Sequence, residues 1–173
     1  MKKIIVISGK QYSGKDTLAK ILLKKLPDFK RIGLGDAIKI EYGKRHNLTF
    51  EQIEKEKHLY RSDLIELGNW GRSQDPKYWL RNLSGMDKII VPDVRMLFEV
   101  EYLKSQGAFL VRVDSSLESR KLRGVITNQD DNTEVELDCF KGWNVVVNND
   151  YDMDYLTSKA DEVLNLFSKF IKS

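Results

Sequence analysis

The chain has 173 residues, of which 41% are hydrophobic and 32% are charged, and its formal net charge is +3. This length suits one domain with a buried core, and so small a charge does not by itself indicate a nucleic-acid partner. No apolar run approaches the roughly 20 residues of a membrane-spanning helix, so we expect no membrane partner. The lone Cys139 rules out an intramolecular disulfide, fits a cytoplasmic location and is expected to be half-buried.

The first half of the chain reads as one buried strand followed by amphipathic helices. The apolar run of residues 3–8 predicts a strand rather than a signal segment, and Leu18, Ile21, Leu22 and Leu26 follow it at the spacing of a helix face. Thr49 and Gln52 form a capping-box pattern at the start of a further helix. The expected elements are a helix over 14–26, an extended segment over 29–35, and helices over 36–46, 49–74 and 76–83.

The second half alternates strands with helices. We expect strands over 87–95, 108–114 and 144–150, helices over 97–107, 116–124 and 153–171, and a polar, irregular and mobile segment over 125–142. Strands that alternate with helices predict a three-layer α/β domain with a parallel sheet, here of five strands flanked by helices. We treat residues 1–173 as one domain.

The segment SGKQYSGKDT, residues 8–17, predicts a phosphate-binding loop. It lies between the first strand and the first helix, where Gly9 and Gly14 let main-chain amides face phosphate oxygens. Lys15 adds a positive charge for the β- and γ-phosphates. A glycine-rich turn without a ligand is the plainer alternative. The predicted nucleotide contacts in the loop are Gly9, Lys10, Ser13, Gly14, Lys15, Asp16 and Thr17.

Asp16 stands where the usual loop motif has Ser or Thr, whose hydroxyl binds Mg²⁺. A carboxylate is also a hard oxygen ligand, so either Asp16 or Thr17 is expected to hold the metal. The alternative is that Asp16 only supplies negative charge at a helix N-terminus.

Further charged residues follow the predicted strands, at the edge where ligands of parallel sheets bind. Asp93 is expected to hold metal-bound water or orient the acceptor, and Arg95 to bind a phosphate, although Asp93 in a structural salt bridge is the alternative. Arg120 and Arg123 are expected to belong to a lid over the triphosphate, or else to line a solvated helix face. The predicted catalytic residues are Lys15, Asp16, Asp93 and Arg95.

A second set of basic residues predicts an acceptor that already carries a phosphate. Arg61 and Arg72 lie three helical turns apart on nearly one face, while Lys57 sits in a charged run that is equally typical of a solvated surface. The predicted acceptor-binding residues are Lys39, Lys57, Arg61, Arg72 and Arg95. This inventory suits phosphoryl transfer, which depends on positioning and charge neutralisation.

The motifs resemble those of a group of nucleoside-monophosphate-kinase-like P-loop enzymes. The loop, with Asp after its lysine, is similar to that of phage-type deoxynucleoside monophosphate kinases and animal-type phosphomevalonate kinases. Residues 89–113, with VPDVR and Glu99, resemble the former, whereas GDAIKIEYGKRHNLTF, YRSDLIELGNWGRSQDPKYW and the region from Arg120 and Arg123 onward resemble the latter. The phosphomevalonate enzymes have a second arginine where this chain has Met96.

The resemblance implies a P-loop NTPase fold with an adenylate-kinase-like lid over about residues 117–142 and acceptor-binding helices over about 36–84. We therefore expect an ATP- and Mg²⁺-dependent kinase that phosphorylates the phosphate of a small molecule. A (deoxy)nucleoside monophosphate is the favoured acceptor, and phosphomevalonate is the alternative. A non-catalytic, nucleotide-dependent switch module is the alternative of another class. The oligomeric state does not follow from the sequence.

Overall fold

The computed structural model describes residues 2–172, and they form two compact units. Among the described residues, the first unit comprises residues 2–31 and 86–172, and the second comprises Ile32–Gly85. Within the described residues, no helix has the length and apolar character that crossing a membrane requires.

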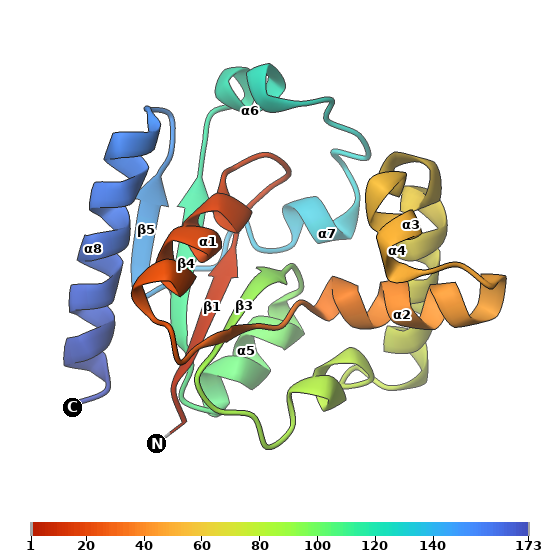
Figure 1. Cartoon of the computed structure of the whole chain (residues 1–173), viewed down its shortest axis with the longest axis horizontal. Coiled ribbons are helices and arrows are strands. Elements are labelled where there is room, and N and C mark those ends of the chain that lie inside the picture. The colour runs from red at the N-terminus through yellow and green to blue at the C-terminus, as the bar shows by residue number, and fades with distance from the viewer. Residues whose placement is uncertain (1, 173) are drawn as a thin grey trace. The chain divides into compact units, whose positions relative to one another are not determined.

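The first unit is built on a five-stranded parallel sheet in the order β2-β3-β1-β4-β5 (Figure 1). Its strands are β1 (Ile4–Ser8), β2 (Lys30–Arg31), β3 (Ile89–Val94), β4 (Phe109–Asp114) and β5 (Val145–Asn148). The predicted α/β class with a parallel sheet is therefore confirmed. The central strand β1 is buried along its whole length, because it has a neighbouring strand on each side and helices on both faces.

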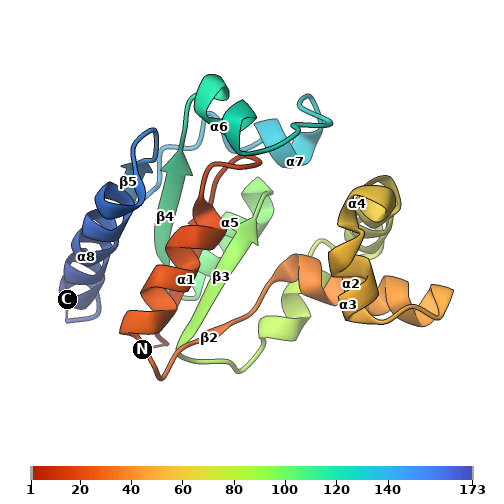
Figure 2. The ribbon, with the colours of Figure 1, turned by 45° about the horizontal axis from the view of Figure 1, so that its top comes forward.

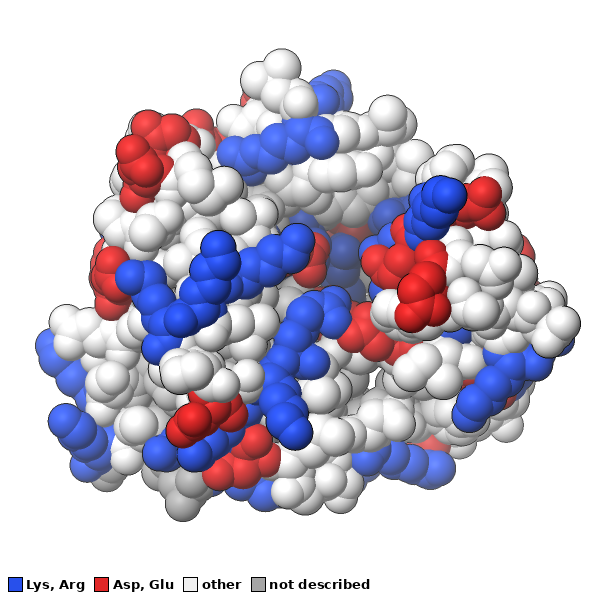
Figure 3. All heavy atoms as spheres, viewed as in Figure 1, with Lys and Arg blue, Asp and Glu red and all other residues white. Residues whose placement is uncertain are grey.

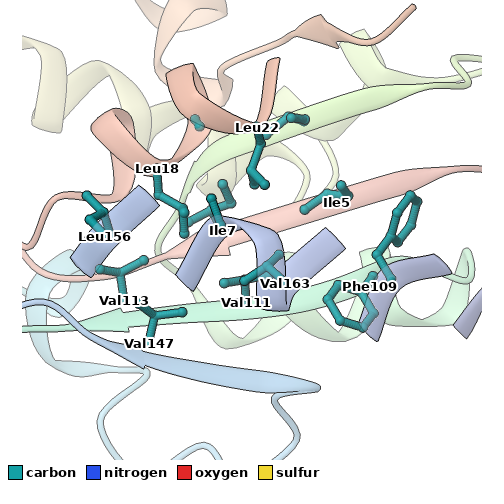
Figure 4. Packing of buried hydrophobic residues seen from close by; sticks show 14 residues of the cluster. Ile5, Ile7, Leu18, Leu22, Phe109, Val111, Val113, Val147, Leu156 and Val163 are labelled. Carbon is teal, nitrogen blue, oxygen red and sulfur yellow. The ribbon is translucent and has the colours of Figure 1, made fainter. Parts of the chain in front are cut away.

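Helices α1 (Lys15–Lys25) and α8 (Met153–Phe170) cover one face of this sheet, and α5 (Leu97–Ser105) lies against the other (Figure 2). Leu18 and Leu22 of α1 pack with Leu156 and Val163 of α8 over the β-branched residues of the strands (Figure 4). Ile7 belongs to the same cluster, so the core extends to the end of β1, directly before the predicted phosphate loop. This packing gives the loop a rigid base.

The segment between β4 and β5 contains two short helices, α6 (Leu117–Arg123) and α7 (Asn132–Val135). The sequence predicted only an irregular segment over 125–142, yet it contains α7 and the buried residues Glu134 and Leu137. Cys139 in this segment is exposed, so the expectation of a half-buried cysteine is wrong. In both ribbon views the segment from α6 to α7 runs beside the loop between β1 and α1 (Figures 1 and 2).

The second unit is helical and consists of α2 (Leu34–His46), α3 (Phe50–Lys55), α4 (Lys57–Gln74) and the 3₁₀ helix η1 (Trp79–Leu83). Its core is formed by Ile38, Tyr42, Ile53, Leu67 and Trp79. Trp79 is central, because its indole Nε1 donates to the Gly68 carbonyl at 2.9 Å and its ring packs against Gly71.

Three predicted elements differ from the structure. The expected helix over 49–74 is interrupted at Glu56 (φ −113°, ψ 28°). The charged residues around Glu56 are exposed, so no packing against the core holds them in one continuous helix. The extended segment over 29–35 pairs with β3 only at Lys30 and Arg31. The Asp36 carboxylate accepts from the Gly33 amide and caps α2, which therefore begins at Leu34. The helix over 76–83 is a turn followed by η1.

Candidate active site

The loop from Gly9 to Gly14 joins β1 to α1 in the predicted strand–loop–helix order. A Cβ atom at Gly9 would lie 2.4 Å from Ser13 Oγ and 2.5 Å from the Val113 carbonyl oxygen, so the loop closes too tightly for any other residue there. Gly14 has φ +100°, a conformation that glycine adopts without steric cost. The two glycines thus have the physical roles that the loop motif requires.

Lys15 is the first residue of α1 and is buried, with only 7% of its side chain exposed. Its Nζ lies 3.4 Å from the Lys10 carbonyl oxygen and 3.9 Å from Asp16 Oδ2. Burial lowers the pKa of Lys15 from 10.5 to about 8, and the positive charge of Arg95 acts in the same direction, whereas the carboxylates of Asp16, Glu134 and Asp93 oppose it. The fold therefore places an ammonium group where an added anion would stabilise it.

Ser13 provides a second sign of an anion site. Its Oγ is buried and has no hydrogen-bond partner among the described residues. Buried hydroxyl groups are nearly always hydrogen-bonded, so this oxygen suits a ligand that brings acceptors into the loop. With the glycine cradle and the buried ammonium, the loop fits a triphosphate.

The carboxylates and hydroxyl predicted to act on a metal lie on or near this loop. Asp16 is exposed and Thr17 is partly buried. Asp93 is half-buried near the end of β3, and its charge raises the pKa of Lys15. Across the part of the chain that the structure describes, no three Asp, Glu, His or Cys side chains gather as a metal site. Mg²⁺ is usually bound by one or two carboxylates plus substrate phosphates, and the residues here fit that donor set.

Arg120 and Arg123 bond to the main chain of the loop. Arg120 Nη1 lies 3.5 Å from the Gln11 carbonyl oxygen, and Arg123 Nη1 donates to the Tyr12 carbonyl at 3.1 Å. The structure thus brings both residues to the predicted loop, while their contact with a triphosphate stays a prediction. Gln11 adds a third link to this segment. Its side-chain amide donates to the Thr127 carbonyl, and its side-chain oxygen accepts from the Thr127 amide.

Arg95 lies at the end of β3 and forms an ion pair with Glu134 of α7. The Glu134 carboxylate also accepts from the Gln11 amide at 3.0 Å, and only 3% of its side chain is exposed. Glu134 therefore links α7 to both the loop and Arg95. Sequence reasoning missed it, because it lies in a polar segment without a motif.

Lys10 belongs to a charged network on the other side of the loop. Its Nζ bonds Asp138 Oδ2 at 2.6 Å, and Asp138 also pairs with Arg112, which in turn holds Asp114. These residues line a cavity of about 490 Å³ beside the loop, together with Trp143. Asp138 thus determines where the Lys10 ammonium lies, and a nucleotide contact by Lys10 stays a prediction.

The other predicted acceptor residues belong to the second unit. Lys39 is buried and forms ion pairs with Asp36 and Glu54. Lys57 and Arg61 lie one turn apart on α4, and Arg72 is about four turns from Lys57, so the three side chains leave the helix within about 60° of one another. The structure therefore places these three residues on one face of one helix, and acceptor binding stays a prediction.

The five-stranded parallel sheet and its loop define a P-loop kinase fold. Solved structures with this fold include shikimate kinases from Bacteroides thetaiotaomicron (TM-score 0.59, 15% identity, 97% of this chain and 99% of that chain) and Aquifex aeolicus (TM-score 0.56, 18%, 99% of each). APS kinase from Mycobacterium tuberculosis is similar too (TM-score 0.55, 19% identity, 96% of this chain and 97% of that chain). At these identities the likeness shows the fold alone.

A sequence model described as phosphomevalonate kinase matches residues 7–109, more than half of the chain, and the chain belongs to this family. The phosphomevalonate kinase of Drosophila melanogaster is 28% identical, over 89% of this chain and 92% of the relative. The protein is therefore a phosphotransferase whose acceptor is a phosphorylated small molecule, and membership of a kinase family implies the use of ATP. The comparisons favour phosphomevalonate over the nucleoside monophosphate that the sequence favoured.

Proposed function

We propose that this protein transfers the γ-phosphate of ATP to the phosphate group of 5-phosphomevalonate and releases 5-diphosphomevalonate and ADP. The family match over residues 7–109 carries the proposal, because it covers both the phosphate loop and the Asp93–Arg95 strand end. The buried Lys15 ammonium and the orphaned Ser13 hydroxyl support the ATP half of the reaction.

The chain's own residues would act by position and charge. Lys15 and the loop amides would hold the triphosphate, and Arg95 would hold a phosphoryl group after leaving Glu134. Mg²⁺, bound by the phosphates with Asp16 or Thr17, would neutralise charge on the transferred group. The acceptor phosphate is itself a nucleophile at neutral pH, so the reaction needs no strong general base.

Lys39, Lys57, Arg61 and Arg72 would provide the acceptor's anion-binding groups. These residues belong to the helical unit and not to the unit that contains the loop, so substituting them is expected to affect acceptor binding and not ATP binding. We expect Arg61→Gln and Arg72→Gln each to raise the KM for the acceptor about tenfold or more, since each removes a charged hydrogen bond, and to leave the KM for ATP nearly unchanged.

Arg81→Gln is the matched control for these two variants. Arg81 lies in the same unit, is largely exposed and pairs with Asp75, so its loss is expected to change neither KM. Equal effects of all three substitutions would contradict the acceptor role.

An acceptor panel tests the function itself. We expect ADP release from ATP and Mg²⁺ to depend on 5-phosphomevalonate and to be much slower with deoxynucleoside monophosphates. Met96, which stands in place of the second arginine of the phosphomevalonate enzymes, is the feature that favours a nucleotide acceptor. Turnover with a deoxynucleoside monophosphate alone would establish that alternative, and ATP binding without any acceptor-dependent turnover would indicate a switch module.

A further inference from the structure

The phosphate loop can present its amides to a ligand only if its carbonyl groups point elsewhere. A peptide unit is planar and trans, so its N–H and C=O point in opposite directions. Each outward carbonyl then needs a partner of its own, because unpaired buried main-chain groups are costly. For the carbonyls of Gln11, Tyr12 and Ser13, these partners are side chains that come from outside the loop.

Three consecutive carbonyls of the loop have such partners. Arg120 approaches the Gln11 carbonyl at 3.5 Å, and Arg123 donates to that of Tyr12 at 3.1 Å. Asn149 Nδ2 donates to the Ser13 carbonyl at 2.8 Å, and Arg123 Nη1 lies 3.4 Å from the same oxygen. The Asn149 bond is buried and is the shortest of these four bonds. The Ser13 carbonyl belongs to the peptide that ends in the Gly14 amide, directly before Lys15.

Asn149 is well placed to fix this peptide. It directly follows β5, only 5% of the residue is exposed, and its amide donates to the Asp114 carbonyl at the end of β4 at 2.8 Å. Its own carbonyl accepts from Ser115 Oγ at 3.0 Å and from Arg123 Nη2 at 2.5 Å. The end of β4 and two side chains that follow it therefore hold the main chain of Asn149 on both sides, and its side chain reaches the loop from a rigid base.

The fit between Asn149 and the loop is close. A Cβ atom at Gly14 would lie 2.1 Å from Asn149 Nδ2, so the amide occupies the space that any larger residue at Gly14 would need. The side chain thus both bonds the Ser13–Gly14 peptide and packs against it.

We propose that Asn149 is a positioning residue for the bound triphosphate. By holding the Ser13 carbonyl outward, its amide turns the Gly14 N–H into the loop, where it meets phosphate oxygens, and sets the start of α1 at Lys15. Asn149 itself acts through the loop and need not touch the substrate. This inference rests on the proposed function, because it assumes that the loop binds ATP.

Two substitutions of Asn149 test this role against a merely structural one at the end of β5. Asn149→Ala removes the donor and is expected to weaken ATP binding about tenfold in calorimetry. Asn149→Asp keeps the shape but places a carboxylate beside the Ser13 carbonyl. The new charge favours a peptide flip that turns this carbonyl into the loop, so we expect a larger loss, of about a hundredfold.

The neighbouring Asn148 offers a matched control. It is exposed, and its Oδ1 accepts from the Asp150 amide at 3.1 Å. Asn148→Ala is expected to bind ATP like the unchanged protein. In steady-state kinetics, the KM for ATP is expected to rise for both Asn149 variants, while the KM for the acceptor stays within about twofold.

A structural role alone would lower the unfolding temperature of the Asn149 variants and leave the ATP affinity of the folded protein unchanged, and this result would overturn the proposal. If the unchanged protein failed to bind ATP, the proposed function would fail with it. If the unchanged protein and Asn149→Asp bound ATP equally, the positioning role alone would fail.

The Gly14 amide of the unchanged protein gives a second test that does not depend on the folding of any variant. In ¹⁵N-resolved spectra, its resonance is expected to move strongly when ADP is added, because the N–H faces the phosphates. A Gly14 resonance that stays in place while those of other loop residues move would overturn the proposal.

Discussion

The buried Lys15 ammonium is expected to increase ATP affinity and to lower the stability of the ligand-free protein. Replacing Lys15 by methionine tests both effects. Burial lowers the Lys15 pKa from 10.5 to about 8. One pKa unit corresponds to about 1.4 kcal/mol, so keeping Lys15 charged in the folded protein lowers the free energy of unfolding by about 3 kcal/mol at neutral pH. Methionine has a similar length and fills the same space without the charge. We therefore expect Lys15→Met to raise the free energy of unfolding by up to about 3 kcal/mol at pH 7.

The sign of the pH dependence follows from the direction of the shift. Below about pH 8 Lys15 is charged in both the folded and the unfolded chain, so the cost is fully present. As the pH rises from about 8 towards 10.5, the folded chain has lost the proton and the unfolded chain still holds it. The advantage of Lys15→Met then falls to about 1 kcal/mol at pH 9.5.

The assay is urea unfolding of both proteins without nucleotide at pH 7 and pH 9.5, with ATP affinity measured by calorimetry. ATP binding is expected to weaken at least about a hundredfold in Lys15→Met, since a charge-assisted hydrogen bond to phosphate is lost. Stabilisation together with loss of ATP binding is the expected pair of results. A variant that is less stable than the unchanged protein at pH 7, or that binds ATP equally well, would contradict this role of Lys15.

Three further predictions concern the same loop. Because ATP stabilises the charged form of Lys15, ATP binding at pH 8.5 is expected to take up most of one proton, and binding at pH 6.5 almost none. Calorimetry in buffers of different ionisation enthalpy measures this proton uptake, and equal uptake at both pH values would contradict the lowered pKa. Glu134→Gln removes a carboxylate that competes for Arg95 and for a loop amide, so the affinity for ATP is expected to rise several-fold, and a fall would show that Glu134 supports binding instead. Gly14→Ala places a methyl group against the Asn149 amide at a positive φ, and it is expected to lower the free energy of unfolding by about 2 kcal/mol and to weaken ATP binding; unchanged stability in thermal unfolding would count against the loop geometry.

The features that the sequence predicted are those with a local signal. The strand, loop and helix around Lys15 follow one another within 25 residues, so their hydrophobic pattern and glycines reveal them together. Arg95 was found because it follows a buried strand, and ligands bind where parallel strands end. These signals need no knowledge of distant parts of the chain.

The missed residues act on main-chain groups far away in the sequence. Glu134 accepts from the Gln11 amide 123 residues away, and Asn149 donates to the Ser13 carbonyl 136 residues away. Main-chain amides and carbonyls are present at nearly every residue, so no side-chain pattern identifies such a partner. Only the fold, which brings the end of β5 and the α7 segment beside the loop, reveals these contacts.

The predicted phosphate ligands show the same limit. On the face shown in Figure 3, many basic side chains lie close to acidic ones. Lys39 and Arg95, two of the predicted phosphate ligands, are held by carboxylates. To bind a phosphate, either side chain would first have to leave its carboxylate partners. The sequence identified these basic residues but not the carboxylates that pair with them, because nothing in the sequence distinguishes Glu54 and Glu134 from ordinary surface residues.

Phosphorus NMR of the reaction products tests the proposed reaction itself. The unchanged protein is mixed with ATP, Mg²⁺ and 5-phosphomevalonate, and the phosphorus resonances are followed with time. We expect the phosphate monoester signal of the acceptor to be replaced by the coupled pair of signals of a diphosphate ester, with one ADP formed for each ester. Loss of ATP to ADP and inorganic phosphate, with the monoester signal unchanged, would contradict the proposed reaction.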